Sequence, residues 1–440
     1  MERLIINELV KWKGRSDRKP LILKGVRQCG KTYILNKFGK DNYEDMAYFN
    51  FEGNPALAER FEQDLNPKRI IMELGVLNGK KINPKTTLII FDEIQFCNKA
   101  LTSLKYFKEN ATEYHVVCAG SLLGITLSKP LSFPVGKVDF LTMYPMNFYE
   151  FVLANNEALL LNYIDENVDI KKPVPQIFAD KLITLLKTYY LTGGMPEVVE
   201  KWIDTKDAAE VGRKQDDILS SYELDFAKHA PATDFPKLSL IWGSIPDQLA
   251  KESRKFVYGH VKPGARAKDL EDSLQWLISS GMVYKVSKIE KPSIPLSAYA
   301  NQNYFKLYMS DIGLLRRMSK LPASSIFEET TLYSEFKGAM TENYVLNELV
   351  NLRGDVPYYW KSGNTAEVDF VTQFDEKIVP IEVKAIVNVK ARSLGIYREK
   401  YKPKVAVRTS MLNIKKDNNL LNIPLYMLWT IEKLINTNKQ

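Results

Sequence analysis

The sequence is poor in cysteine and contains no long apolar run. Its 440 residues include three cysteines, Cys29, Cys97 and Cys118, without a CxxC spacing. An odd count without paired spacing argues against a disulfide framework. No apolar stretch approaches the roughly 20 residues that span a bilayer, and the first residues lack the apolar core of a signal peptide. We therefore expect a cytoplasmic protein in a reducing compartment.

Internal repeats and low-complexity tracts are also lacking, so repeat architectures are not indicated. A length of 440 residues exceeds one hydrophobic core and suggests two to four domains, at roughly 100–200 residues each. The net charge of +8 permits a polyanionic partner but does not require one, because a lysine-rich solvated surface gives the same sum.

Short apolar runs alternate with more polar, periodic stretches over the first 120 residues. Strands are expected at residues 20–25, 46–51, 87–91 and 115–119, and helices at residues 31–38, 55–61, 67–77 and 100–110. This alternation predicts βαβ units and a parallel, doubly wound sheet.

GVRQCGKT, residues 25–32, fits the P-loop pattern G-x4-G-K-[ST] between an expected strand and an expected helix. The glycines allow backbone N–H groups to surround a phosphate at a helix N-terminus. Lys31 would neutralise phosphate charge, and Thr32 would present its hydroxyl to Mg²⁺. The candidate ATP contacts are Gly25, Arg27, Gly30, Lys31, Thr32, Tyr33 and, from the next motif, Asp92.

LIIFDE supplies the carboxylates that hydrolysis requires. Asp92 at the end of an apolar strand is the expected Mg²⁺ ligand beside Thr32, and Glu93 the expected residue that polarises the attacking water. Without the loop upstream, the FDE sequence at residues 91–93 would also fit a solvated strand end. Ser121, which follows the next strand, is a candidate γ-phosphate sensor or a plain turn residue.

The middle of the chain is mainly helical. Helices are expected at residues 177–190 and 208–222, then at 236–250 and 266–280 before a strand at 281–286. Two helices followed by a β-wing suggest a winged helix, which either contacts DNA or only packs against protein. Acidic residues at 269–272 oppose groove binding. The candidate phosphate contacts are Lys262, Arg266, Lys268 and Lys285.

The tail carries a second carboxylate set. Glu342 lies on an expected helix, and Asp369 and Glu382 lie on expected neighbouring strands, with Lys384 two residues beyond Glu382. The pattern Glu…Asp…Glu-x-Lys is typical of restriction-type nucleases: the carboxylates hold Mg²⁺ and the lysine orients water. Glu367 is an alternative ligand. The pattern also fits charged strand ends at a solvent edge, and the basic stretch at residues 390–408 either follows a nucleic-acid backbone or is a solvated face.

The chain resembles the prokaryotic AAA-type ATPases that carry a C-terminal domain of unknown function with a restriction-endonuclease-like, PD-(D/E)xK fold. The resemblance rests on GVRQCGKT, LIIFDEIQ, CAGSLLG, residues 134–151, YYLTGGMPEVV, LYMSDIGLL and the tail carboxylate set. It implies an AAA core at residues 1–148, a helical lid at 149–228, a winged-helix segment at 229–300 and a nuclease-like α/β domain at 301–440. Relatives commonly have Gly-Arg where this chain has Gly136-Lys137, so Lys137 would be a weaker trans-acting finger.

We therefore expect an ATP-hydrolysing, Mg²⁺-dependent protein that acts on or senses DNA or RNA, with Lys31, Glu93, Ser121 and Lys384 as catalytic candidates. Two other interpretations remain open. In one, the ATPase is a nucleotide switch, and the tail and winged helix bind a protein or DNA partner without cutting it. In the other, the ATPase acts on protein. A homo-oligomer is compatible with all three.

Overall fold

The computed structural model describes residues 1–120, 136–327, 334–363, 366–385 and 392–437. The chain divides into two compact units, Met1–Tyr144 with Ser279–Gly281 and Pro145–Ile278 with Met282–Gln440. All three cysteines are buried and free, in agreement with the prediction from their count. Within these ranges, every helix is too short or too polar to cross a membrane.

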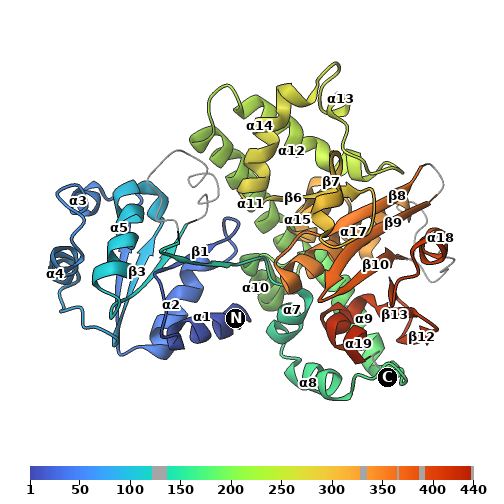
Figure 1. The fold of residues 1–440 in the computed structure, drawn as a ribbon, viewed down its shortest axis with the longest axis horizontal. Coiled ribbons are helices and arrows are strands. Elements are labelled where there is room, and N and C mark those ends of the chain that lie inside the picture. The colour runs from blue at the N-terminus through green and yellow to red at the C-terminus, as the bar shows by residue number, and fades with distance from the viewer. Residues whose placement is uncertain (121–135, 328–333, 364–365, 386–391, 438–440) are drawn as a thin grey trace. The chain divides into compact units, whose positions relative to one another are not determined.

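The first unit alternates strands and helices along its length (Figure 1). Its elements are α1 (Ile5–Gly14), β1 (Leu21–Lys24), α2 (Lys31–Asn42), β2 (Asp45–Asn50), α3 (Pro55–Glu59), α4 (Pro67–Asn78), β3 (Thr87–Asp92), η1 (Ile94–Phe96), α5 (Asn98–Asn110), β4 (His115–Ala119) and β5 (Asp139–Thr142). The four strands and four helices expected before residue 121 are present. Strand β5 was not predicted.

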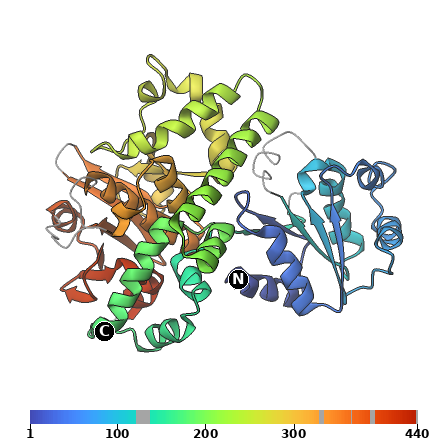
Figure 2. The same cartoon turned by 180° about the vertical axis from the view of Figure 1, so that it is seen from behind.

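The strands of the first unit form a parallel sheet in the order β2-β3-β4-β1-β5. Helices α3, α4 and α5 share one hydrophobic cluster with residues of β2 and β3, and α2 packs on the opposite face (Figures 1 and 2). Because all strands are parallel, their carboxyl ends share one edge. The predicted doubly wound sheet is therefore confirmed, and β1 and β3 deliver their next residues to the same side.

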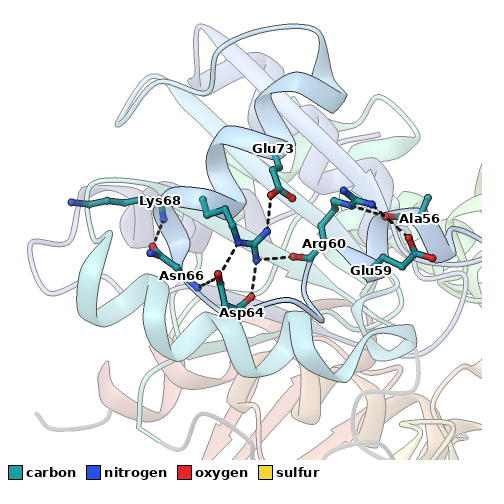
Figure 3. A network of polar contacts seen from close by, with 8 residues as sticks. Ala56, Glu59, Arg60, Asp64, Asn66, Lys68 and Glu73 are labelled. Carbon is teal, nitrogen blue, oxygen red and sulfur yellow. Dashed lines mark hydrogen bonds and ion pairs between the residues drawn. The ribbon is translucent and has the colours of Figure 1, made fainter.

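The connection between α3 and α4 is fixed by Arg69 on α4. Its guanidinium contacts Asp64 Oδ1 at 2.9 Å and Glu73 Oε1 at 2.8 Å, and it donates to the carbonyl of Arg60 at 2.9 Å. Figure 3 shows these acceptors gathered around one guanidinium. A planar group with five donors can hold two carboxylates and a carbonyl together, so this network ties the segment after α3 to the first turns of α4.

The second unit contains a helical part and a mixed sheet. The helical elements are α7 (Phe148–Ala154), α8 (Ala158–Asn167), α9 (Gln176–Thr192), α10 (Pro196–Thr205), α11 (Ala208–His229), α12 (Phe235–Leu249), α13 (Tyr258–Val261), α14 (Ala267–Ser279), η2 (Leu296–Tyr299), α15 (Ile312–Met318), α16 (Ser324–Phe327), α17 (Ser334–Arg353), α18 (Arg392–Tyr401), η4 (Leu425–Thr430) and α19 (Ile431–Thr437). The strands are β6 (Val283–Ile289), β7 (Ala300–Met309), β8 (Tyr358–Ser362), β9 (Ala366–Phe374), β10 (Lys377–Val383), β11 (Ala406–Ser410), β12 (Lys415–Asp417) and β13 (Leu420–Pro424).

The eight strands form one sheet in the order β12-β13-β11-β10-β9-β8-β6-β7. The β6–β7 pair, in the region where a wing was expected, joins the tail strands through parallel pairing of β6 with β8. The expected helices at residues 236–250 and 266–280 correspond to α12 and α14. The winged-helix assignment and the domain limits at 148, 228 and 300 stay predictions.

Two glycine-containing motifs from the sequence meet at a buried aspartate. Asp311 accepts a hydrogen bond from the N–H of Gly194 at 2.6 Å and another from the first turn of α15 at 2.9 Å. A methyl group at Gly193, where φ is +70°, would collide with the Asp311 carboxylate, and one at Gly313 would collide with the backbone of Thr192. The stretches TGGMPE and SDIGLL therefore require glycine because their backbones touch.

Candidate functional site

The loop at residues 25–32 has the geometry of a phosphate-binding loop. Gly25 and Gly30 adopt φ of 156° and 93°, and a methyl group at Gly25 would collide with the carbonyl of Met143. Gly30 immediately precedes α2, so the free N–H groups of that helix point to the loop. The Lys31 ammonium donates to the carbonyls of Gly25 and Val26, both at 2.9 Å. The loop thus combines the N–H donors at the start of α2 with a lysine whose ammonium is hydrogen-bonded to the carbonyls of the same loop.

Asp92, at the end of β3, lies against this loop. Its Oδ2 accepts hydrogen bonds from Thr32 Oγ1 at 2.8 Å and from the Tyr48 hydroxyl at 2.7 Å, and its Oδ1 accepts one from the N–H of Glu93 at 3.0 Å. Strand β4 separates β3 from β1, but Thr32 lies on α2 and reaches Asp92 across the sheet edge. The predicted Thr32–Asp92 pair is therefore brought together.

Tyr48, on β2, is a site residue that the sequence did not indicate. Burial, followed by the hydrogen bond to Asp92, raises the pKa of the Tyr48 phenol, so the hydroxyl stays protonated and remains a donor. A tyrosine in an alternating strand has no distinctive sequence signal.

Glu93 follows Asp92 in a left-handed backbone conformation, with φ of 48° and ψ of 42°. Its carboxylate accepts a hydrogen bond from the side-chain amide of Gln95. Left-handed backbone is costly for a non-glycine residue and is common at functional sites. The turn places Glu93 directly beside the Asp92 backbone.

The other candidate residues of the first unit are Tyr33, Arg27, Lys137 and Ser121. Tyr33 is 56% exposed, and Arg27 is partly exposed in the loop. Lys137 pairs with Glu109 at 2.9 Å. It precedes β5, whose first residue lies opposite Leu21 at the start of β1, so Lys137 lies at the sheet edge opposite the loop. Ser121 lies outside the described residues.

The tail residues of the second unit also come together. Strands β9 and β10 are antiparallel, and Asp369 Oδ2 accepts a hydrogen bond from the N–H of Val383 at 2.7 Å. This contact places Asp369 beside Glu382. Lys384 contacts Glu382 Oε1 at 2.7 Å. The prediction that these residues lie on neighbouring strands agrees with this pairing.

Glu342 and Glu367 are held by cations. Arg254 pairs with Glu342 Oε1, and the buried Lys306 lies 2.6 Å from Glu367 Oε1 and 3.9 Å from Glu342 Oε2. Lys361 contacts Glu367 Oε2 at 3.1 Å. We call the set of four carboxylates and four cations the tail cluster. Its members are Arg254, Lys306, Glu342, Lys361, Glu367, Asp369, Glu382 and Lys384.

Burial and charge divide the tail carboxylates into two kinds. Burial raises the pKa of Asp369, and burial followed by the repulsion of Asp369 raises the pKa of Glu382 to about 7. Burial also acts to raise the pKa of Glu367, but Lys306 and Lys361 outweigh it and lower that pKa. Glu382 Oε2 is buried without a hydrogen-bond partner in the described part of the chain. The charged forms of Asp369 and Glu382 are thus disfavoured, whereas the charge of Glu367 is compensated by Lys306 and Lys361.

No group of three or more His, Cys, Asp or Glu residues is arranged to hold a metal ion in the described ranges. Mg²⁺ commonly takes one or two protein carboxylates and completes its shell with water and phosphate oxygens. Asp369 and Glu382 fit this requirement. Glu342 does not, because it already pairs with the cations Arg254 and Lys306.

Sequence reasoning also missed Arg254, Lys306 and Tyr308. Lys306 carries a signal in retrospect: it is a single charged residue inside the apolar strand FKLYM, residues 305–309. A charged residue at 1% exposure requires a buried partner. Arg254 lies in an irregular loop far along the chain and has no comparable signal.

The winged-helix candidates are mostly exposed. Lys262, Arg266 and Lys268 are exposed, whereas Lys285 is half-buried over the ring of Phe305, 4.5 Å from its centroid. Burial lowers the pKa of Lys285.

Comparison with known protein families gives three matches. Residues 17–152 match a family model described as an AAA domain. Residues 183–325 and 337–428 match two models described as domains of unknown function, DUF8612 and DUF4143. A search of curated proteins found no match.

Among solved structures, a Walker-type ATPase of Pyrococcus abyssi is similar at 13% identity and a TM-score of 0.44, over 72% of this chain and 95% of that one. The ORC1 protein of Aeropyrum pernix in complex with DNA matches at 14% identity and a TM-score of 0.30, over 73% of this chain and 93% of that one. DnaA of Aquifex aeolicus bound to AMPPCP matches at 13% identity and a TM-score of 0.27, over 62% of this chain and 86% of that one.

The family match spans the loop, Asp92 and the parallel sheet whose geometry is described above. The chain therefore carries an AAA-type P-loop ATPase domain.

Proposed function

We propose that the first unit hydrolyses ATP with Mg²⁺ held by Thr32 and Asp92. The observation that supports this best is the contact of Thr32 Oγ1 with Asp92 Oδ2 at 2.8 Å. A hydroxyl and a carboxylate are the hard oxygen donors that Mg²⁺ prefers. When bound, the ion would neutralise phosphate charge and orient the phosphoryl group.

The residues of the chain supply the remaining roles. The loop N–H groups surround the phosphates, and the Lys31 ammonium moves from the loop carbonyls to phosphate oxygens. Asp92 stays oriented because Tyr48 and the N–H of Glu93 hold both of its oxygens. Glu93 accepts the proton of the attacking water. Arg27 and Tyr33 are proposed nucleotide contacts, and Ser121 is a proposed sensor.

Glu93→Gln tests this assignment because it keeps the shape of the side chain and removes its basicity. We expect a loss of roughly 100-fold or more in kcat, in the range of a lost general base, with ATP binding retained. The matched control is Glu62→Gln, at an exposed glutamate of the same unit, which should leave turnover unchanged. Wild-type turnover in Glu93→Gln would remove Glu93 from the mechanism.

For the second unit we propose a metal-dependent, nuclease-like tail acting on DNA or RNA. The supporting observation is the buried, unpartnered Glu382 Oε2, with Lys384 at 2.7 Å from the other oxygen. A divalent ion between Asp369 and Glu382 would polarise a phosphodiester. Lys384 would hold and orient water beside it, and Val383 would keep Asp369 oriented through its N–H.

A cleavage assay with Mg²⁺ or Mn²⁺ on single- and double-stranded DNA and RNA tests this tail function. Lys384→Ala should abolish cleavage, whereas Lys320→Ala, at an exposed lysine of the second unit, should not. Salt-dependent binding without cutting would instead favour the nucleotide-switched binding module. No nucleic-acid binding at low salt would favour an ATPase that acts on protein.

A lysine-rich cleft supports a polyanionic partner. It has a volume of about 740 Å³ and is formed by the end of α8, the segment that follows it, β12 and α19. Four lysines line it, and the two acidic residues of the lining, Glu166 and Asp169, offset part of their charge. The partly exposed ring of Tyr163 offers a stacking surface. The lysines are Lys171, Lys172, Lys416 and Lys433.

Charge reversal at Lys171 and Lys172 should weaken nucleic-acid binding and lower the salt slope by about 1–2. The comparison is charge reversal at Lys262 and Lys268, the exposed candidate phosphate contacts of the proposed winged-helix segment. A loss with the comparison pair alone would move the contact surface to the winged-helix segment.

A further inference from the structure

Lys306 occupies an unusual place in the tail cluster. It lies on β7 between two buried apolar residues, Phe305 and Leu307, and is 1% exposed. Its ammonium is 2.6 Å from Glu367 Oε1 and 3.9 Å from Glu342 Oε2. A buried ammonium persists only with anionic partners, because desolvation opposes its charge. Lys306 is therefore a fixed cation among the carboxylates.

The remaining oxygens of Glu342 and Glu367 are engaged as well. Arg254 pairs with Glu342 Oε1, the Tyr308 hydroxyl donates to Glu342 Oε2 at 3.0 Å, and Lys361 contacts Glu367 Oε2 at 3.1 Å. A metal ion at either carboxylate would therefore lie beside a cation that already pairs with it.

Asp369 and Glu382 differ in this respect. Asp369 is oriented by a backbone N–H, and one Glu382 oxygen contacts Lys384 while the other is buried without a hydrogen-bond partner in the described ranges. These two side chains are the part of the cluster that still has acceptor capacity for a cation.

We propose that the tail cluster takes one divalent cation, at Asp369 and Glu382, and that Lys306, with Arg254, takes the place of a second. This inference rests on the proposed tail function. Two-metal phosphodiester sites hold their ions about 3.5–4 Å apart. A second ion here would require Glu342 or Glu367 as a ligand and would lie beside a buried ammonium, where repulsion is strong.

Counting bound Mn²⁺ tests the proposal. Calorimetric titration of the full chain without nucleotide, in an Asp92→Asn background that removes the first-unit carboxylate, should give one Mn²⁺ per chain. Adding Asp369→Asn should reduce the count to zero. A count of two would overturn the one-ion inference and leave the tail function standing. A count of zero before Asp369 is changed would overturn both.

Lys306→Met tests the cause. It should raise the count to two, because Glu367 Oε1 and Glu342 Oε2 lose their shared cation. Lys306→Met with Glu367→Gln, which restores the charge balance, should bind one ion. If folded Lys306→Met still binds one ion, Lys306 is not what excludes the second. If Lys306→Met does not fold, the double variant and the Asp369→Asn series still decide the count.

Discussion

The nucleotide loop and the tail cluster both contain engaged carboxylates, but the two sites hold them with different partners. Asp92 is held by two hydroxyls and a backbone N–H, all uncharged donors. Glu342 and Glu367 are held by guanidinium and ammonium groups. A hydroxyl can turn its oxygen to an incoming cation, whereas an ammonium has no acceptor and must move away.

This difference indicates how each site responds to a metal ion. In the proposed ATPase, Mg²⁺ replaces only uncharged partners of Asp92 at the first site. The second is already partly neutralised by its basic side chains, and burial raises the pKa of Asp369 and of Glu382. Four experiments can break or sharpen this contrast, and they are given from the largest expected effect to the smallest.

Lys31→Ala should produce the largest effect, and only in the first unit. We expect ATP turnover to fall by roughly 100- to 1000-fold, the range for losing one electrostatic contact to a reacting group, with Mn²⁺ binding by the tail unchanged. Phosphate release and calorimetry measure the two. Lys37→Ala, at an exposed α2 lysine paired with Asp41, is the control. A parallel loss of tail metal binding would show that the sites are not independent.

Arg254→Gln should destabilise the second unit because it leaves Glu342 with less compensating charge. Breaking a buried pair costs about 3–5 kcal/mol; the cost here should be nearer the lower end, since Arg254 is 20% exposed and Glu342 keeps Tyr308. Thermal unfolding should show a midpoint lower by several degrees. Adding Glu342→Gln should recover much of the loss. An equal loss in the single and double variants would mean that the pair is not coupled.

Tail metal binding should weaken as pH falls. Burial and Asp369 raise the pKa of Glu382 to about 7, and a proton on Glu382 competes with the cation. Below pH 7, Mn²⁺ affinity should therefore fall by about tenfold per pH unit for one competing proton. Calorimetry from pH 5.5 to 8 measures this, and Glu382→Gln should remove the dependence along with most of the affinity. A flat wild-type profile would place the cation elsewhere.

Tyr48→Phe should have the smallest effect. It removes one neutral hydrogen bond to Asp92, worth about 0.5–1.5 kcal/mol. The Mg²⁺ concentration for half-maximal ATP turnover should rise a few-fold, with kcat nearly unchanged. Tyr43→Phe, whose hydroxyl contacts His115 at 2.7 Å instead, should have no such effect. A lower kcat without a shift in Mg²⁺ demand would give Tyr48 another role.

Much of the first unit was predictable because its signals are local. The loop, its strand and its helix are contiguous, and the apolar run at residues 88–91 leads directly to Asp92. Strand β5 was missed because its exposure alternates over four residues only. Tyr48 was missed because its role depends on how β2 pairs with β3, which no local pattern reveals.

The second unit was predictable in parts. The strands carrying Asp369 and Glu382 were located, since the first half of β9 alternates and β10 is a short, mostly apolar run. The cations were not, because Arg254 and Lys306 reach the carboxylates from segments 88 and 36 residues before Glu342 in the numbering. Long-range charge pairing of this kind leaves no trace in spacing.

The continuity of the eight-stranded sheet has a consequence for modular inheritance. The family model that matches residues 337–428 contains every tail carboxylate, but Arg254, Lys306, strand β6 and the edge strand β7 fall within the match at residues 183–325. A recombination or a truncation between the two segments would separate the acids from their counter-ions and uncover the edge of β8. The two segments therefore have reason to be inherited, expressed and exchanged as a single piece.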